Sequence, residues 1–80
     1  MTLDDLPIGQ VARVAHHTAD KMSIELTERL EEIGFTLGEN VAVLARGVPG
    51  GDPLVVRIGQ SRFALRRTEA QRVHVVVERM

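Results

Sequence analysis

The sequence contains no cysteine, tryptophan or tyrosine, and Phe35 and Phe63 are its only phenylalanines. Without cysteine, disulfides, thiolate metal sites and thiol nucleophiles are all excluded. Two phenylalanines are too few to build the aromatic platform on which single-stranded bases stack. The formal net charge of −1 also gives no positive field to hold a polyanion. We therefore expect no nucleic-acid partner.

Long hydrophobic runs are also missing from the chain. No apolar segment approaches the roughly 20 residues that a membrane helix needs, and the opening Met-Thr-Leu-Asp-Asp is acidic where a secretory signal is basic. We expect a cytoplasmic protein with no direct membrane insertion. Eighty residues suffice for one hydrophobic core and not for two, so residues 1–80 are expected to form one domain.

Alternation of apolar and polar residues predicts five short strands. In the first strand the alternation places Ala12, Val14 and His16 on one face. Gly59-Gln60-Ser61 predicts a tight turn that joins the third and fourth strands into a hairpin. The five predicted strands cover residues 10–16, 40–46, 54–58, 62–66 and 73–78.

One segment has the period of a helix instead. Met22, Leu26, Leu30 and Ile33 are spaced so that they form one helical stripe, with Ser23 as the expected N-cap and Gly34 as the residue after the C-terminus. Two further helical turns are expected, the first at residues 2–5, where Thr2 and Asp5 have capping spacing, and the second at residues 68–71, where Thr68 and Gln71 suggest a capping box.

These elements predict a mainly β fold: a small, partly open SH3-like barrel of five strands. One α-helix is inserted after the first strand, and a short helical turn precedes the last. Closing the sheet on itself would remove exposed strand edges. An OB-type barrel is less favoured, because its helix usually falls between later strands.

Several short motifs lie along almost the whole chain in a fixed order and spacing. They are Leu6-Pro7-Ile8-Gly9, residues 28–35, Gly38 with Val41 and Val43, Gly51-Asp52-Pro53-Leu54, residues 63–70, and Val73 with Val75. Together they resemble the ferrous iron transport protein A (FeoA) family. Leu37 departs from the family, which frequently has proline before the glycine equivalent to Gly38.

The resemblance implies an SH3-like fold, a cytoplasmic location, no catalysis and no required cofactor. It also implies a role beside the membrane permease FeoB, which carries a cytoplasmic GTPase domain. The same barrel, by resemblance, occurs in iron-dependent repressors, so a metal-binding or metal-sensing domain is the alternative function.

The residues themselves offer no catalytic constellation. Ser23 and Ser61 fit a helix cap and a turn, and the glycine-rich segment 47–51 is not followed by the Lys-Ser/Thr helix start of a phosphate loop. A binding protein is therefore favoured over an enzyme.

Partner binding is expected at the helix and the glycine-rich loop, because small-barrel clefts commonly receive peptides. Ile24 lies off the apolar stripe of the helix, and Phe35 and Leu37 follow the helix end. An alternative role for Phe35 and Leu37 is to close the core. Weak self-association through an exposed edge strand is a further alternative. The candidate residues are Ile24, Glu28, Phe35, Leu37, Val48 and Pro49.

The three histidines, His16, His17 and His74, are candidate ligands of Fe(II) or another divalent transition metal, with His16 and His17 as the weak candidates for a site. The acidic residues Asp20 and Glu78 lie near one or another histidine in the sequence. Adjacent residues of a strand point to opposite faces, so His16 and His17 are not expected to hold one ion together.

Arg62, Arg66 and Arg67 form the densest basic group of the sequence. A solvated edge with an ion pair to Glu28 or Glu32 is the favoured interpretation. Docking on an acidic partner surface is the second interpretation, and nucleic-acid binding is the last.

Overall fold

The computed structural model describes residues 1–17 and 24–77. Ser23, Met22 and Asp20, and Glu78 near the end of the chain, lie outside this range. The described elements are η1 (Leu3–Asp5), β1 (Val11–His17), α1 (Ile24–Glu32), β2 (Asn40–Arg46), β3 (Leu54–Ile58), β4 (Ser61–Leu65), α2 (Arg67–Ala70) and β5 (Val73–Val77). No helix in the described ranges is long and apolar enough to cross a membrane.

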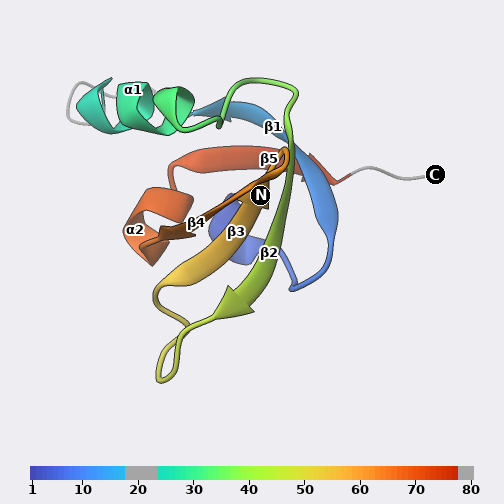
Figure 1. Ribbon diagram of the computed structural model, residues 1–80, viewed down its shortest axis with the longest axis vertical. Helices are drawn as coiled ribbons and strands as arrows, with labels where there is room; N and C mark the ends of the chain where they lie inside the picture. The colour runs from blue at the N-terminus through green and yellow to red at the C-terminus, as the bar shows by residue number, and fades with distance from the viewer. Residues whose placement is uncertain (18–23, 78–80) are drawn as a thin grey trace.

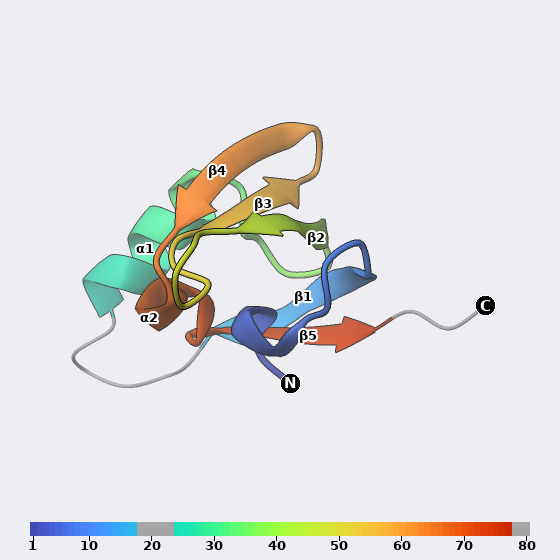
Figure 2. The ribbon, with the colours of Figure 1, turned by 90° about the horizontal axis from the view of Figure 1, so that it is seen from below.

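The five strands form one antiparallel sheet in the order β4-β3-β2-β1-β5. The sheet curls so that β2, β3 and β4 form one layer and β1 and β5 the other, with α1 and α2 at one side of the layers (Figures 1 and 2). The prediction of a mainly β fold, with one helix after the first strand and a short helix before the last, is confirmed.

The core fills the space between these layers, and its members follow the alternation that the sequence predicts for β3, where Leu54, Val56 and Ile58 are buried. Leu3 and Leu6 close the core from the N-terminal side. The remaining buried members of the core are Ala12, Val14, Leu30, Phe35, Val41, Val43, Leu65, Ala70, Val73 and Val75.

A β-bulge in β1 changes the faces that the sequence predicts for its end. The pairing register with β5 shifts between Val14 and His16, and one extra residue in a strand moves every later side chain to the other face. His16 is therefore exposed and His17 is half-buried. The prediction that His16 shares the face of Ala12 and Val14 is wrong for this reason.

The end of α1 shows why Gly34 is needed. Its φ of +117° is a backbone conformation that favours glycine. The N–H of Phe35 donates to the Leu30 carbonyl at 2.9 Å, and the N–H of Gly34 donates to that of Glu31 at 3.1 Å. These are the two hydrogen bonds of a Schellman motif, and the accompanying apolar pair, Leu30 and Phe35, is fully buried.

The short helix α2 begins earlier than the sequence predicts. The backbone N–H of Arg66 donates to the Glu69 carboxylate at 3.0 Å, so Arg66 and Glu69, and not Thr68 and Gln71, have the capping spacing. The pattern of a hydroxyl three residues before an amide was misleading, because the acid at the third helical position caps the turn from inside.

Asp4 connects η1 with two other elements. Its side chain is 7% exposed, and its carboxylate accepts hydrogen bonds from Arg46 Nη1, Arg67 Nε and Gln71 Nε2, each at 3.1 Å. The hydrogen bond from Arg67 is the main reason why the pKa of Asp4 is lowered to about 2, and Gln71 and Arg46 lower it further against the opposing effect of burial. Asp4 thus ties the N-terminal turn to β2 and α2.

The basic group predicted near α1 is distributed differently in the structure. Arg67 pairs with Asp4 at 3.1 Å, and Arg66 lies 3.9 Å from Asp52. The expected ion pair with Glu28 or Glu32 is replaced by these contacts, because α2 turns this segment toward η1.

We predict that Asp4→Asn lowers the free energy of unfolding at pH 7 by roughly 1–2 kcal/mol. The folded-state pKa of about 2 lies below the ordinary 3.8. The carboxylate's contribution is therefore present above about pH 4 and disappears as the pH falls through about 2. Denaturant unfolding should show that the difference in the free energy of unfolding between the wild type and Asp4→Asn decreases as the pH falls from about 4 to about 2. Glu31→Gln, an exposed acid on α1, is the control, and a difference that stays constant would show that charge is not its cause.

Candidate functional site

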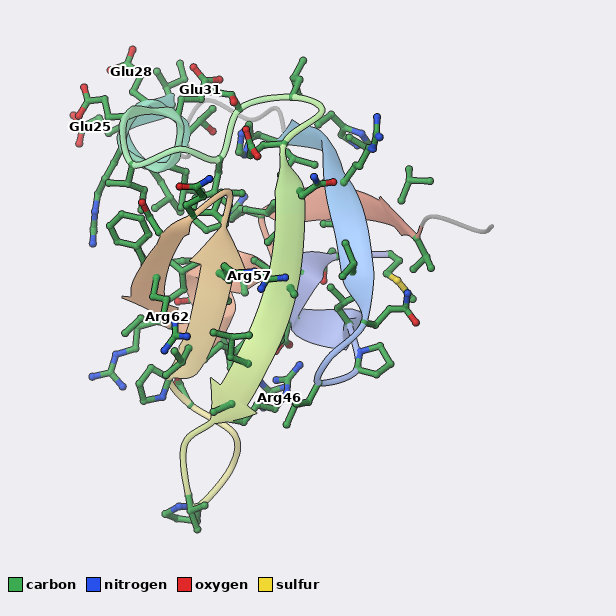
Figure 3. All side chains as sticks on the ribbon, turned by 45° about the vertical axis from the view of Figure 1, so that its right-hand side comes forward. Glu25, Glu28, Glu31, Arg46, Arg57 and Arg62 are labelled. Carbon is green, nitrogen blue, oxygen red and sulfur yellow. The ribbon has the colours of Figure 1, made fainter. Side chains whose placement is uncertain are left out.

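The outer face of α1 carries two exposed apolar side chains at its ends. Leu26, Leu30 and Ile33 pack against the core, which turns Ile24 and Glu28 to the outside. Ile24 is 56% exposed at the start of the helix, and Leu37 is 67% exposed beyond its end. Between these ends the helix presents acidic side chains, including Glu25, Glu28 and Glu31 (Figure 3).

Phe35 does not belong to this surface. Its side chain is fully buried, so the core role that the sequence left open for Phe35 and Leu37 applies to Phe35 only. Its carbonyl oxygen lies 2.7 Å from His17 Nε2, which links the end of α1 to the end of β1. Phe35 therefore holds the surface in place but offers it no side chain.

The loop between β2 and β3, which contains Val48 and Pro49, extends from the opposite end of the sheet from α1 (Figure 1). Val48 is 94% exposed at the tip of the loop. Gly47 closes the loop base: its N–H donates to the Pro53 carbonyl at 2.8 Å, and a Cβ at Gly47 would lie 2.5 Å from the Asp52 carbonyl oxygen. The tip of the loop therefore lies away from α1, whereas Pro53 at its base lines a groove that α1 also lines.

The structure brings together two histidines that the sequence analysis did not pair. His16 on β1 lies opposite His74 on β5, and their rings stack with centroids 4.2 Å apart and planes 9° apart. Burial, followed by the neighbouring charge of His16, lowers the pKa of His74. The bulge in β1 produces this pairing, which residue spacing does not reveal.

The histidines do not make a closed metal centre. Within residues 1–17 and 24–77, no three His, Asp, Glu or Cys side chains are grouped so that they could hold an ion. His17 points away from His16, as expected, and within the same ranges its Nδ1 is buried without a hydrogen-bond partner. A structural site normally has four protein ligands, so residues 1–17 and 24–77 do not by themselves supply one; the candidate acids Asp20 and Glu78 lie outside these ranges.

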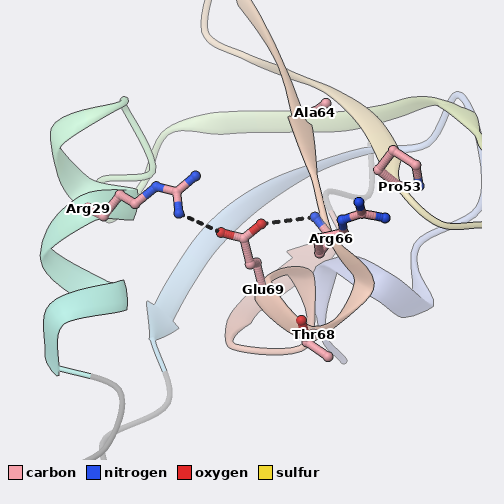
Figure 4. Close-up of a pocket in the computed structure, with 6 residues that line it drawn as sticks. All are labelled: Arg29, Pro53, Ala64, Arg66, Thr68 and Glu69. Atoms are coloured by element: carbon pink, nitrogen blue, oxygen red, sulfur yellow. Dashed lines mark hydrogen bonds and ion pairs between the residues drawn. The ribbon is translucent and has the colours of Figure 1, made fainter.

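A groove lies between α1 and the segment from β4 to α2, and the sequence did not predict that this segment forms one of its walls (Figure 4). It has a volume of about 550 Å³. Arg29 crosses it to Glu69 with a nitrogen to oxygen distance of 3.3 Å. The lining residues are Arg29, Pro53, Ala64, Arg66, Thr68 and Glu69. Arg29 lies on the predicted helix, Pro53 ends the predicted loop and Arg66 belongs to the predicted basic group, but the sequence did not show that these three segments meet.

The stacked histidines lead to a pH prediction. Because the folded-state pKa of His74 is lowered from 6.5, the unfolded chain takes up the proton first as the pH falls. The stability associated with neutral His74 is therefore present at pH 8 and decreases below about pH 6.5. Thermal unfolding between pH 8 and pH 5 should show a smaller decrease for His74→Gln than for the wild type. Equal decreases would assign the effect to other groups.

Comparisons with known proteins place the chain among others of the same fold. The family model described as the FeoA domain matches residues 1–77. The structure of Stenotrophomonas maltophilia FeoA complexed with zinc, described as a prokaryotic SH3 domain protein, is 43% identical, with a TM-score of 0.84 over 95% of this chain and 89% of that one. The solution structure of FeoA from Chlorobium tepidum is 31% identical, with a TM-score of 0.81 over 96% of this chain and 70% of that one.

A third similar structure is a manganese-dependent transcriptional repressor, which is 27% identical, with a TM-score of 0.77. The alignment covers 96% of this chain and 40% of the repressor. No curated protein matches the sequence.

Proposed function

The chain belongs to the FeoA family, and from this premise we propose that it is a cytoplasmic accessory protein of bacterial ferrous iron uptake. It acts by binding the cytoplasmic part of a FeoB-type permease that carries a GTPase domain. The family match over residues 1–77 supports the pathway, and an SH3-like domain of this size is suited to binding. The binding itself is the part of the proposal that experiment must test.

The observation that carries the choice of surface is the exposure of Ile24 and Leu37 around an acidic helix face. Each of the two is a single exposed side chain and not a continuous patch, so on this proposal they would act as two apolar anchors within a polar rim. The acidic residues between them, Glu28 among them, favour a basic partner surface and would speed association. Val48 and Pro49 lie at the other end of the molecule, so they form a second candidate contact that is separate from α1.

We predict that Ile24→Glu weakens binding to the purified cytoplasmic domain of the permease about tenfold, which corresponds to about 1.4 kcal/mol. Ile24 is exposed, so the fold should survive its replacement. Val48→Glu adds the same charge at the opposite end and serves as the matched control. Isothermal titration of the three proteins measures the effect. Unchanged binding by folded Ile24→Glu would remove α1 from the interface, and loss with Val48→Glu alone would move the interface to the loop.

The rival function, metal sensing, makes a different prediction about His16 and His74. Their stacked rings are the described arrangement closest to a metal site, but two imidazoles lack the further ligands of a tight one. Anaerobic titration calorimetry with Fe(II) should therefore give only weak heats that decrease in His16→Gln. Stoichiometric, tight binding that this variant abolishes would favour the sensing function over the accessory one.

A further inference from the structure

The two edge strands of the sheet, β5 and β4, differ in whether another segment covers them. At the β5 edge, the N–H of Val75 donates to the Met1 carbonyl at 3.0 Å, and Thr2 forms a bridge with His74. The β4 edge has no such cover: its strand pairs with β3 on one side, and no other described segment forms a backbone hydrogen bond to residues 61–65. An uncovered edge can accept another strand.

The hairpin register shows which groups of β4 are available. Gly59 and Gln60 form a two-residue turn, so its flanking pair, Ile58 and Ser61, exchanges backbone hydrogen bonds. Alternation then directs the backbone groups of Phe63 and Leu65 toward β3. The N–H and C=O groups of Arg62 and Ala64 point to the open edge.

The groove beside α1 gives this edge room for a ligand. Ala64 and Arg66 form one wall, and Arg29 on α1 forms the other (Figure 4). Its volume of about 550 Å³ is enough for a few residues of extended chain. Glu69 is the acidic residue of the lining and is already engaged by Arg29 and by the Arg66 N–H.

The charges along β4 indicate what kind of chain fits. Arg66 follows β4 with an extended backbone, so alternation places it on the same face as Arg62. Arg62 lies directly opposite Arg57 of β3 (Figure 3). Like charges in this position destabilise a sheet. Among the described residues neither Arg57 nor Arg62 has an acidic partner, and Arg66 has only Asp52 at 3.9 Å. Carboxylates on an added strand would relieve this repulsion.

The opposite face of β4 requires apolar side chains from the same ligand. Phe63 lies on that face and is only half-buried against the core. An added strand would therefore alternate acidic and apolar residues. A proline-rich ligand is disfavoured, because its recognition uses aromatic-lined grooves and the chain has no tryptophan or tyrosine.

We propose that the open edge of β4 binds an extended acidic segment of another protein as an added strand, with carboxylates beside Arg62 and Arg66. A second copy of this chain is a poor occupant, because edge-to-edge pairing would bring the arginines of both copies together. The site is separate from the outer face of α1 and does not depend on the proposed role in iron uptake. Its failure and that of the α1 interface are therefore distinguishable.

The test uses a fluorescent, end-blocked peptide of about six alternating glutamates and valines, with a lysine-valine peptide as its matched control. Fluorescence anisotropy should show that the wild type binds the acidic peptide and that Arg66→Glu weakens this binding about tenfold. Binding should also weaken with added salt. Equal binding of the two peptides, or no binding of either, would overturn the proposal.

Backbone pairing is tested separately from charge. Ala64→Pro removes an N–H that β3 does not use, at an edge position where proline is tolerated, and should abolish binding. Ala64→Val keeps the N–H and should bind. Alternate amides of an added strand point toward β4 or away from it. Two peptides, each N-methylated at one of these two sets of amides, therefore test pairing without a protein variant, because only the peptide methylated on the side facing β4 should lose binding. Equal affinity of both methylated peptides and the parent would show that no strand is added.

Discussion

The hydrogen bonds of Asp4 connect the N-terminal turn η1 to β2 and to α2. The carboxylate is shielded from solvent and is bound by side chains of β2 and α2. A contact with the backbone has the same effect, because Arg46 also donates a hydrogen bond to the Asp4 carbonyl oxygen. An 80-residue domain buries little surface. A single well-satisfied carboxylate can therefore decide where the N-terminal turn and α2 lie, and with them the segment from β4 to α2 that lines the groove.

The elements were predictable where local signals agreed with each other. The stripe of Leu26, Leu30 and Ile33 ends at Gly34, which occupies the left-handed position that the sequence predicts. Alternation in β3 identified the buried face correctly. The errors lie at β1 and α2, where a bulge and an acidic residue within the first turn changed the pattern. The position of the bulge and the start of α2 depend on strand pairing and on helix capping, and several residue patterns are compatible with each.

The candidate site was less predictable, because it depends on distances between segments. The sequence placed the helix and the glycine-rich loop beside one cleft, but only the loop base at Pro53 lines the groove beside α1, and the loop tip extends from the opposite end of the sheet. Arg29 and Glu69 meet across the groove although they are 40 positions apart, and no spacing rule covers such a pair. Exposure of Ile24 was predictable, since it follows from helix geometry alone.

The arrangement of charge suggests how a partner is oriented. Acidic side chains gather on α1 at one end of the molecule, whereas Arg57 and Arg62 lie on the sheet (Figure 3). The molecule measures 33 × 31 × 22 Å, but the two sites are closer than these lengths, because α1 also forms one wall of the groove beside β4. Charges on partners bound at the two sites would therefore be only partly screened from each other at physiological salt, where the Debye length is about 8 Å. A basic partner on α1 and an acidic segment on β4 would attract each other, so binding at one site should not weaken binding at the other through charge.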